Sequence, residues 1–231
     1  GHTLGKLLVY TLACILWYTI VYTPGSTLGA PQRKTPEYTH GYAPGATLCK
    51  AYPEVYPRAY PRAGVPEFLE EFARWTIDQG CALFASHGPH FLKGIEIYKG
   101  KPIFYSLGNF IFQNETVLWL PDEAYRRFNL GYDQTPGDYL DTRSGGGTRA
   151  FASDPVFWRS VVAVCNYSRG NLKEVLLYPI DMGYGRPMPQ RGRPVLAEGH
   201  IAQQTLTWLQ DVSKPFDTEI TISDGVGVIR V

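Results

Sequence analysis

The chain contains few charged residues, and their signs are balanced. Asp, Glu, Lys and Arg make up 19% of its 231 residues, and the formal net charge is +1. No run of lysines and arginines occurs that could neutralise a phosphate backbone, which nucleic-acid-binding proteins require. We therefore expect no nucleic-acid partner. A hydrophobic content of 44% instead indicates a globular protein with a sizeable core.

Cysteine is also scarce, and its spacing excludes the common cysteine motifs. The four cysteines, at positions 14, 49, 81 and 165, include no Cys-x-x-Cys pair, as zinc ribbons and thiol oxidoreductases have. Cys81 and Cys165 lie in apolar, strand-like runs. We predict that both are buried free thiols.

Histidine occurs only five times, yet two histidines share the run ASHGPH at residues 85–90. The apolar residues 81–85 predict a buried strand, so His87 and His90 would project from a loop at its C-terminal end, where open α/β sheets place their sites. Pro89 restricts the loop and favours metal ligation by both imidazoles. Simple hydrogen bonding in a turn remains the alternative, because the run has no carboxylate.

A second polar motif, YSLGNF at residues 105–110, follows a predicted hairpin in which Lys99-Gly100 forms the turn. The Asn109 amide is a candidate to bind a substrate or the histidine loop, although Gly-Asn pairs also end strands for conformational reasons. Glu96 lies on the face opposite Ile95 and Ile97. It would either orient an imidazole or remain a solvated strand residue.

These motifs, in this order, resemble the CapA family of poly-γ-glutamate capsule synthesis proteins, from about Pro66 to the C-terminus. The resemblance implies an α+β fold: a calcineurin-like, metallophosphatase-type β-sandwich with flanking helices. It also implies a site for divalent Mn, Fe or Zn, with His87 and His90 as the metal-binding and catalytic residues. Family members read GHHPH at the loop, where this chain has Ser86 and Gly88.

The resemblance also implies earlier motifs that supply Asp, Glu, Asn and His ligands, and none is found before Pro66. We therefore expect a fold lacking its N-terminal part, with a partial metal site. Residues 7–23 are uncharged and follow Lys6, so residues 1–23 would be an export signal or membrane anchor, a buried strand pair, or non-native sequence. Residues 24–65 read as a Pro/Tyr-rich linker, or alternatively as a segment that recognises a partner.

The remaining sequence predicts a strand-rich body within the domain at 66–231. Helices are expected over residues 66–80 and 200–212, and hairpins over 160–180 and 217–231. The Gly-rich stretch at 133–149 reads as a mobile loop within an insertion at 114–155, of the kind that often forms a lid. His200, alone at a helix start, is expected to be a cap or surface residue.

Arg191 and Arg193 form the one compact cationic motif of the matched region, QRGRP at residues 190–194. Their guanidinium groups could bind an anionic polymer such as polyglutamate, or a small anionic substrate, although ordinary surface ion pairs are equally consistent. Two function classes remain open. The chain is either a metal-dependent hydrolase of ester or amide bonds, or a non-catalytic component of capsule polymer biosynthesis or export. We expect it to be extracytoplasmic or membrane-associated if the N-terminal segment is a signal or anchor, and cytoplasmic otherwise.

Overall fold

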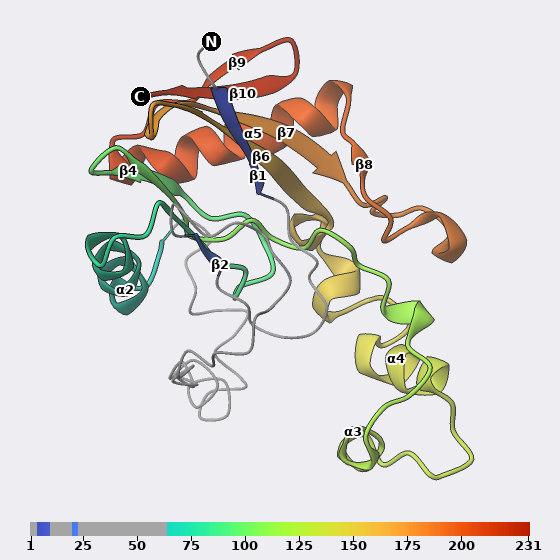
Figure 1. Cartoon of the computed structure of the whole chain (residues 1–231). Helices are drawn as coiled ribbons and strands as arrows, with labels where there is room; N and C mark the ends of the chain where they lie inside the picture. The colour runs from blue at the N-terminus through green and yellow to red at the C-terminus, as the bar shows by residue number, and fades with distance from the viewer. Residues whose placement is uncertain (1–3, 10–19, 23–63) are drawn as a thin grey trace.

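The computed structural model of the chain describes residues 4–9, 20–22 and 64–231, and these form two sheets with flanking helices (Figure 1). Sheet A is antiparallel, in the order β1 (Leu4–Val9), β6 (Arg159–Ser168), β7 (Asn171–Asp181), β10 (Val226–Arg230) and β9 (Thr221–Ser223), and the short β8 (Val195–Leu196) also pairs with β7. Sheet B has the order β2 (Ile20–Tyr22), β3 (Leu83–Ala85), β5 (Lys101–Phe104) and β4 (Ile95–Tyr98).

The main core lies between the two sheets. Leu83, Ala85 and Phe104 from sheet B form one buried cluster with Val161, Ala163 and Leu177 from sheet A, together with Leu206 and Leu209 of helix α5 (Gly199–Ser213). In β6 and β7 the inward-facing residues alternate with more exposed ones, as two packed sheets require. The predicted α+β class is confirmed.

Helix α2 (Glu67–Asp78) covers the other face of sheet B. Its buried residues Ala73 and Ile77 pack against Phe84 and Ile103 of the sheet. The predicted helix is confirmed, and most of its large apolar side chains are not the ones it buries. Phe68, Phe72 and Trp75 are each about half exposed, because the smaller residues of the helix face the sheet.

The three predicted hairpin turns are confirmed. Each has two residues with positive φ between its strands, Lys99-Gly100, Arg169-Gly170 and Asp224-Gly225, which matches the twist of a two-residue hairpin loop. In the last hairpin β9 begins only at Thr221, four residues later than predicted.

The insertion that connects β5 to β6 extends away from the two sheets (Figure 1). It contains more regular structure than the sequence predicts. It contains α3 (Asp122–Arg127), α4 (Pro136–Ser144) and three 3-10 turns, η1 (Asn114–Thr116), η2 (Ala150–Ser153) and η3 (Pro155–Trp158). The prediction of a loop over residues 133–149 is wrong because Thr135 and Asp138 form a capping box that starts α4, and Gly145, in the left-handed conformation, ends it. Two more 3-10 turns, η4 (Met188–Gln190) and η5 (Lys214–Phe216), lie near the C-terminus.

Some predictions for the N-terminal third fall on residues that the structure does not describe. β1 pairs with β6 and β2 pairs with β3, so the described parts of residues 1–23 are strands that do not pair with each other. The predicted linker lies almost wholly outside the described residues, as do Cys14 and Cys49. In the described ranges, no helix has the length and apolar character needed to cross a membrane. Cys81 and Cys165 are buried free thiols, as predicted.

Candidate functional site

The histidine loop and the Asn109 segment leave the same edge of sheet B. β3 and β5 are parallel neighbours, so the chain that follows each of them emerges side by side. The Ser86 amide donates to the Phe104 carbonyl (3.0 Å), and the Leu107 amide donates to the Ser86 carbonyl (3.0 Å). The loop position is therefore as predicted, although β3 ends at Ala85, two residues before His87.

A tight turn sets the separation of the two histidines along the chain. The His90 amide donates to the His87 carbonyl (2.9 Å), which closes a turn over residues 87–90. His90 has φ +63°, a left-handed conformation that costs a non-glycine residue about 1 kcal/mol. The surrounding structure holds His90 in a geometry that a free loop would not prefer.

His87 is buried, and its Nδ1 lies 3.1 Å from the Gly108 carbonyl oxygen. Because a carbonyl only accepts, Nδ1 carries the proton and Nε2 keeps its lone pair. Burial lowers the pKa of His87, the bond to Gly108 opposes that shift, and the nearby His90 adds to it. His87 is thus a neutral imidazole with its Nε2 in the form that binds metals.

His90 is held in the same tautomer by a side chain. Its Nδ1 lies 2.8 Å from Asn109 Oδ1, and Asn109 Nδ2 donates to the Phe157 carbonyl (3.0 Å). The Phe157 carbonyl fixes the orientation of the amide, so Asn109 presents its oxygen to His90 and Nδ1 must donate. Of the roles considered for Asn109, the hydrogen bond to the histidine loop is present in the structure.

An aromatic cluster borders His90. The Phe151 ring lies 5.0 Å from the His90 ring, and Phe151 packs on Phe112 (5.8 Å) and Phe157 (4.8 Å). Sequence reasoning missed Phe151 and Phe157, because they arrive on η2 and η3, some sixty residues after the loop, and have no motif around them.

One of the two predicted arginines, Arg191, lies at the border of this cluster. The Arg191 guanidinium carbon lies 5.5 Å from the centre of the Trp158 ring, and that ring packs on Phe112 at 4.8 Å. We call residues 190–194 the arginine loop. The Phe112 amide donates to the Gly192 carbonyl (2.8 Å), which holds this loop against the cluster. Arg193 is exposed. His200 is also exposed at the start of α5, where Glu198 is the N-cap, so it is a surface residue.

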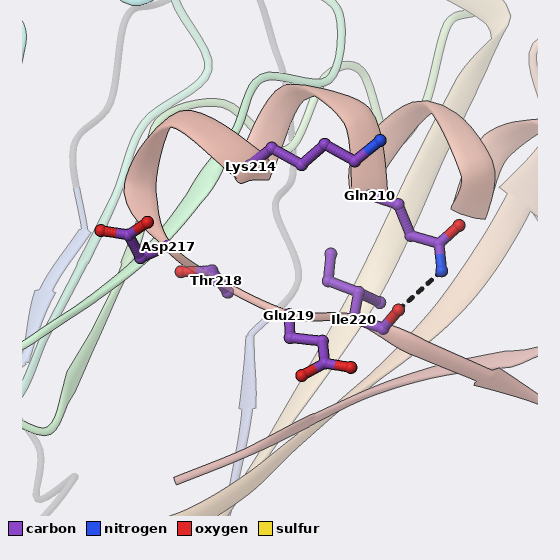
Figure 2. A pocket seen from close by; sticks show the side chains of 6 residues that line it. All are labelled: Gln210, Lys214, Asp217, Thr218, Glu219 and Ile220. Atoms are coloured by element: carbon purple, nitrogen blue, oxygen red, sulfur yellow. Dashed lines mark hydrogen bonds between the residues drawn. The ribbon is translucent and has the colours of Figure 1, made fainter.

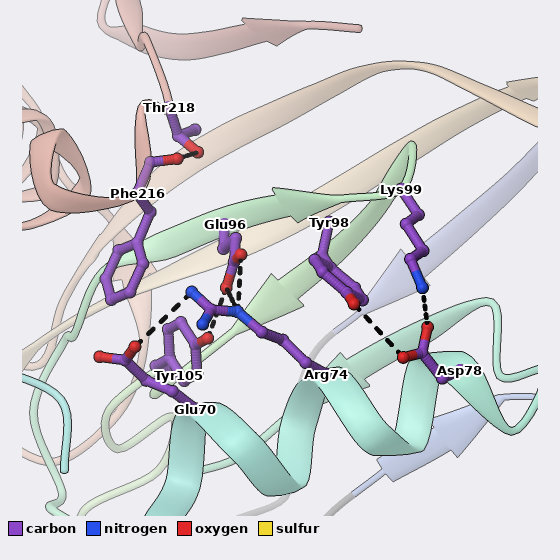
Figure 3. Close-up of polar contacts among 9 residues, drawn as sticks. All are labelled: Glu70, Arg74, Asp78, Glu96, Tyr98, Lys99, Tyr105, Phe216 and Thr218. Atoms are coloured by element: carbon purple, nitrogen blue, oxygen red, sulfur yellow. Dashed lines mark hydrogen bonds and ion pairs between the residues drawn. The ribbon is translucent and has the colours of Figure 1, made fainter. Parts of the chain in front are cut away.

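Glu96 is neither solvated nor an imidazole partner, and both readings made from the sequence are wrong. It is buried, and its carboxylate accepts from Arg74 Nε (3.0 and 3.2 Å) and from the Tyr105 hydroxyl (2.5 Å), as Figure 3 shows. Burial and this bond raise the pKa of Tyr105. Because α2 covers this face of sheet B, Glu96 joins the helix to the sheet instead of facing solvent.

A separate open pocket of about 460 Å³ lies at the end of α5 (Figure 2). Its lining is Gln210, Lys214, Asp217, Thr218, Glu219 and Ile220. Gln210 Nε2 donates to the Ile220 carbonyl (2.7 Å), and Lys214 pairs with Asp211 (2.7 Å). None of the predicted site residues lines it, so the candidate site remains the histidine loop.

As a metal centre, the loop supplies two ligands of a suitable kind. Both Nδ1 atoms donate to oxygen acceptors, the arrangement that orients metal-binding histidines in proteins. In the part of the chain that the structure describes, no group of three or more His, Cys, Asp or Glu side chains could hold an ion. The pair could supply two ligands of a metal ion, and a complete set of ligands would need residues from elsewhere.

Comparison with known proteins identifies the segment that contains this site. Residues 62–114 match the family model of the bacterial capsule synthesis protein PGA_cap. The PGA biosynthesis protein CapA of Bacillus subtilis is 50% identical over 42 residues, covering 18% of this chain and 11% of the relative. The capsule biosynthesis protein CapA of Bacillus anthracis is 44% identical over 43 residues, covering 19% and 10%. Through this segment, the chain belongs to the CapA family.

A longer match covers more of this CapA-family chain. The uncharacterized protein y4sH of Sinorhizobium fredii (strain NBRC 101917 / NGR234) is 40% identical over 176 residues, which is 71% of this chain and 37% of y4sH. The chain therefore spans little more than a third of that relative. The part that matches the family model includes α2, the histidine loop, the β4–β5 hairpin and Asn109, whereas the aromatic cluster from Phe151 onward lies beyond it.

Proposed function

We propose that this CapA-family chain takes part in the biosynthesis or export of an anionic capsule polymer of the poly-γ-glutamate kind, and that His87 and His90 bind a divalent metal ion. The two-sheet core with α2 outside it is compatible with a metallophosphatase-type fold. The polymer partner, the metal and an extracytoplasmic or membrane-associated location all belong to this proposal.

The observation that supports it best is the fixed tautomer of both histidines. Gly108 and Asn109 each accept from the Nδ1 of one ring, so Nε2 is the nitrogen that each ring would offer to a cation. A turn with only a structural role would not need two imidazoles prepared in the same way. Imidazole nitrogen suits zinc and iron, and it occurs in manganese sites beside carboxylates.

The residues of this chain would contribute orientation and shielding. Asn109 fixes the plane of the His90 ring, and Phe151 covers one side of that ring and limits the access of water. When bound, the metal would polarise an ester or amide bond and lower the pKa of a bound water. Arg191 is a candidate to bind the anionic groups of the polymer at the edge of the aromatic cluster.

A non-catalytic role in capsule assembly is the second candidate, and one observation favours it. The described residues provide two metal ligands, whereas hydrolytic zinc sites commonly use three protein ligands. A chain that retained the fold and the histidine loop could still bind polymer or a partner protein without hydrolysing a bond.

Metal analysis of the purified chain separates the two. We expect about one equivalent of Mn, Fe or Zn per chain, lost in His87→Ala and in His90→Ala and retained in His200→Ala, because His200 is exposed at the start of α5. Circular dichroism would verify that each variant is folded. An unsubstituted chain that binds no metal after loading with each ion would contradict the metal site and leave the non-catalytic role.

A further inference from the structure

The Phe151 ring contacts two polar groups from different parts of the fold. His90 lies on it at 5.0 Å between ring centres, and the Arg143 guanidinium carbon lies 5.9 Å from the same ring centre. One aromatic side chain therefore contacts both the histidine loop and a cation carried by the insertion. Sequence motifs gave no reason to connect residue 143 with residue 90.

The backbone of Arg143 is held firmly although its side chain is exposed. Arg143 lies in the last turn of α4, which begins at the Thr135 capping box and ends at Gly145. Arg149 folds back over that turn and donates from Nε to the Arg143 carbonyl (3.1 Å) and from Nη2 to the Thr142 carbonyl (2.6 Å). Arg149 thus satisfies carbonyls at the end of α4 and fixes the backbone from which the Arg143 side chain extends.

The Arg143 guanidinium differs from several other arginines in what it binds. Arg74, Arg126 and Arg186 each form an ion pair with a carboxylate, at distances between 2.5 and 3.0 Å. Among the described residues, no carboxylate pairs with Arg143, and its contact is the face of Phe151. A contact with an aromatic ring does not neutralise the cation as a carboxylate does, and the planar fork of a guanidinium matches an oxyanion.

We propose that Arg143 binds an oxyanion, a carboxylate or a phosphate, of a ligand bound beside His90. The proposal rests on the proposed function only in taking the histidine loop as the site. The insertion then supplies a binding residue to that site, and Phe151 determines the spacing between the anion and the His90 ring.

The test uses the full chain in EDTA, titrated separately with inorganic phosphate and with succinate, while NMR follows the His90 imidazole signals. We expect saturable binding of at least one of the two anions, weakened about tenfold by Arg143→Gln, because charge-assisted hydrogen bonds are among the stronger ones. Arg143→Lys should weaken binding less, since it keeps the charge but loses the fork. Which anion binds identifies the ligand as a phosphate or a carboxylate.

Arg127→Gln is the matched control, because Arg127 is exposed in the last turn of α3 in the same insertion. It should leave anion affinity within about twofold of the parent, as a screened, solvent-exposed charge does. Equal affinities of Arg143→Gln and Arg127→Gln, or no binding of either anion by the parent, would overturn the proposal. The metal content of Arg143→Gln should equal that of the parent, so loss of the metal site and loss of the anion site are told apart.

Discussion

Among single residues, Asn109 determines the geometry of the candidate site more than its position after a strand suggests. Its oxygen accepts from His90, and its nitrogen donates to Phe157, 48 positions further along the chain. The amide thereby joins the histidine loop to η3, and its side chain is almost fully buried. A residue that orients a ligand in this way affects metal binding without touching the metal.

We expect Asn109→Leu to weaken metal binding by roughly 10- to 100-fold, the usual effect of removing an orienting partner of a ligand histidine. Leucine has the same branched arrangement of side-chain heavy atoms as asparagine, so the site should remain filled while the Nδ1 acceptor is lost. Competition with a chromogenic chelator would measure the affinity. Asn171→Leu, at an exposed position at the start of β7, is the control, and equal affinities in the two variants would argue against the positioning role.

At the scale of secondary-structure elements, local chemistry was predictable and the environment of each element was not. The paired positive φ values at Lys99-Gly100 follow from the rule for two-residue loops, so the hairpin could be predicted from four or five residues. Which face of α2 is buried depends on sheet B, so the half-exposed Trp75 and the buried Glu96 could not be predicted from periodicity. Helix α4 differs from the predicted loop because the Thr135 capping box starts a helix before the glycines, and Gly145 serves to end it.

Gly192 in the arginine loop combines a left-handed backbone with a close contact, and Gly100 has the same backbone conformation without the contact. Gly192 has φ +80°, and a Cβ there would lie 2.2 Å from the Phe112 carbonyl oxygen, which is backbone and cannot move aside. Gly100 has φ +72° and nothing within 4 Å of its would-be Cβ. The two positions share the backbone conformation and differ in the space around them.

We therefore expect Gly100→Ala to reduce the free energy of unfolding by about 1 kcal/mol, the cost of a left-handed alanine. Gly192→Ala should reduce it by about 3 kcal/mol or more, since the clash adds to that cost. Urea denaturation followed by tryptophan fluorescence would measure both. Equal losses would mean that the arginine loop moves away from Phe112 at little cost.

At the scale of the whole molecule, the site forms where one edge of sheet B meets the insertion. The meeting of the histidine loop with residues 105–109 was predictable, because both follow neighbouring strands of one sheet. The contribution of Phe151, Phe157 and Arg143 was not, because it depends on how a long insertion returns to the sheet. Family resemblance identified the loop, and the three-dimensional packing added the residues around it.

The stability of the whole fold should also depend on pH through the titration of one buried lysine, Lys93. Lys93 is 2% exposed, donates from Nζ to the Gly64 carbonyl (2.6 Å) and lies 4.8 Å from the centre of the Phe91 ring. Burial lowers the pKa of Lys93 to about 8, from an ordinary value of 10.5. Between these two pKa values the unfolded chain holds a proton that the folded chain has released, so stability rises with pH there.

We expect the free energy of unfolding of the parent to increase, relative to that of Lys93→Met, by about 2 kcal/mol between pH 7 and pH 10. The methionine fills a similar volume and does not titrate, so the difference isolates this one group from the other titrations of the chain. Urea denaturation at both pH values would measure it. Lys173 lies at an exposed position of β7 and is the control. The difference in free energy of unfolding between the parent and Lys173→Met should change by less than about 0.5 kcal/mol over the same pH range. A change as large as the one found with Lys93→Met would show that burial of Lys93 is not the cause.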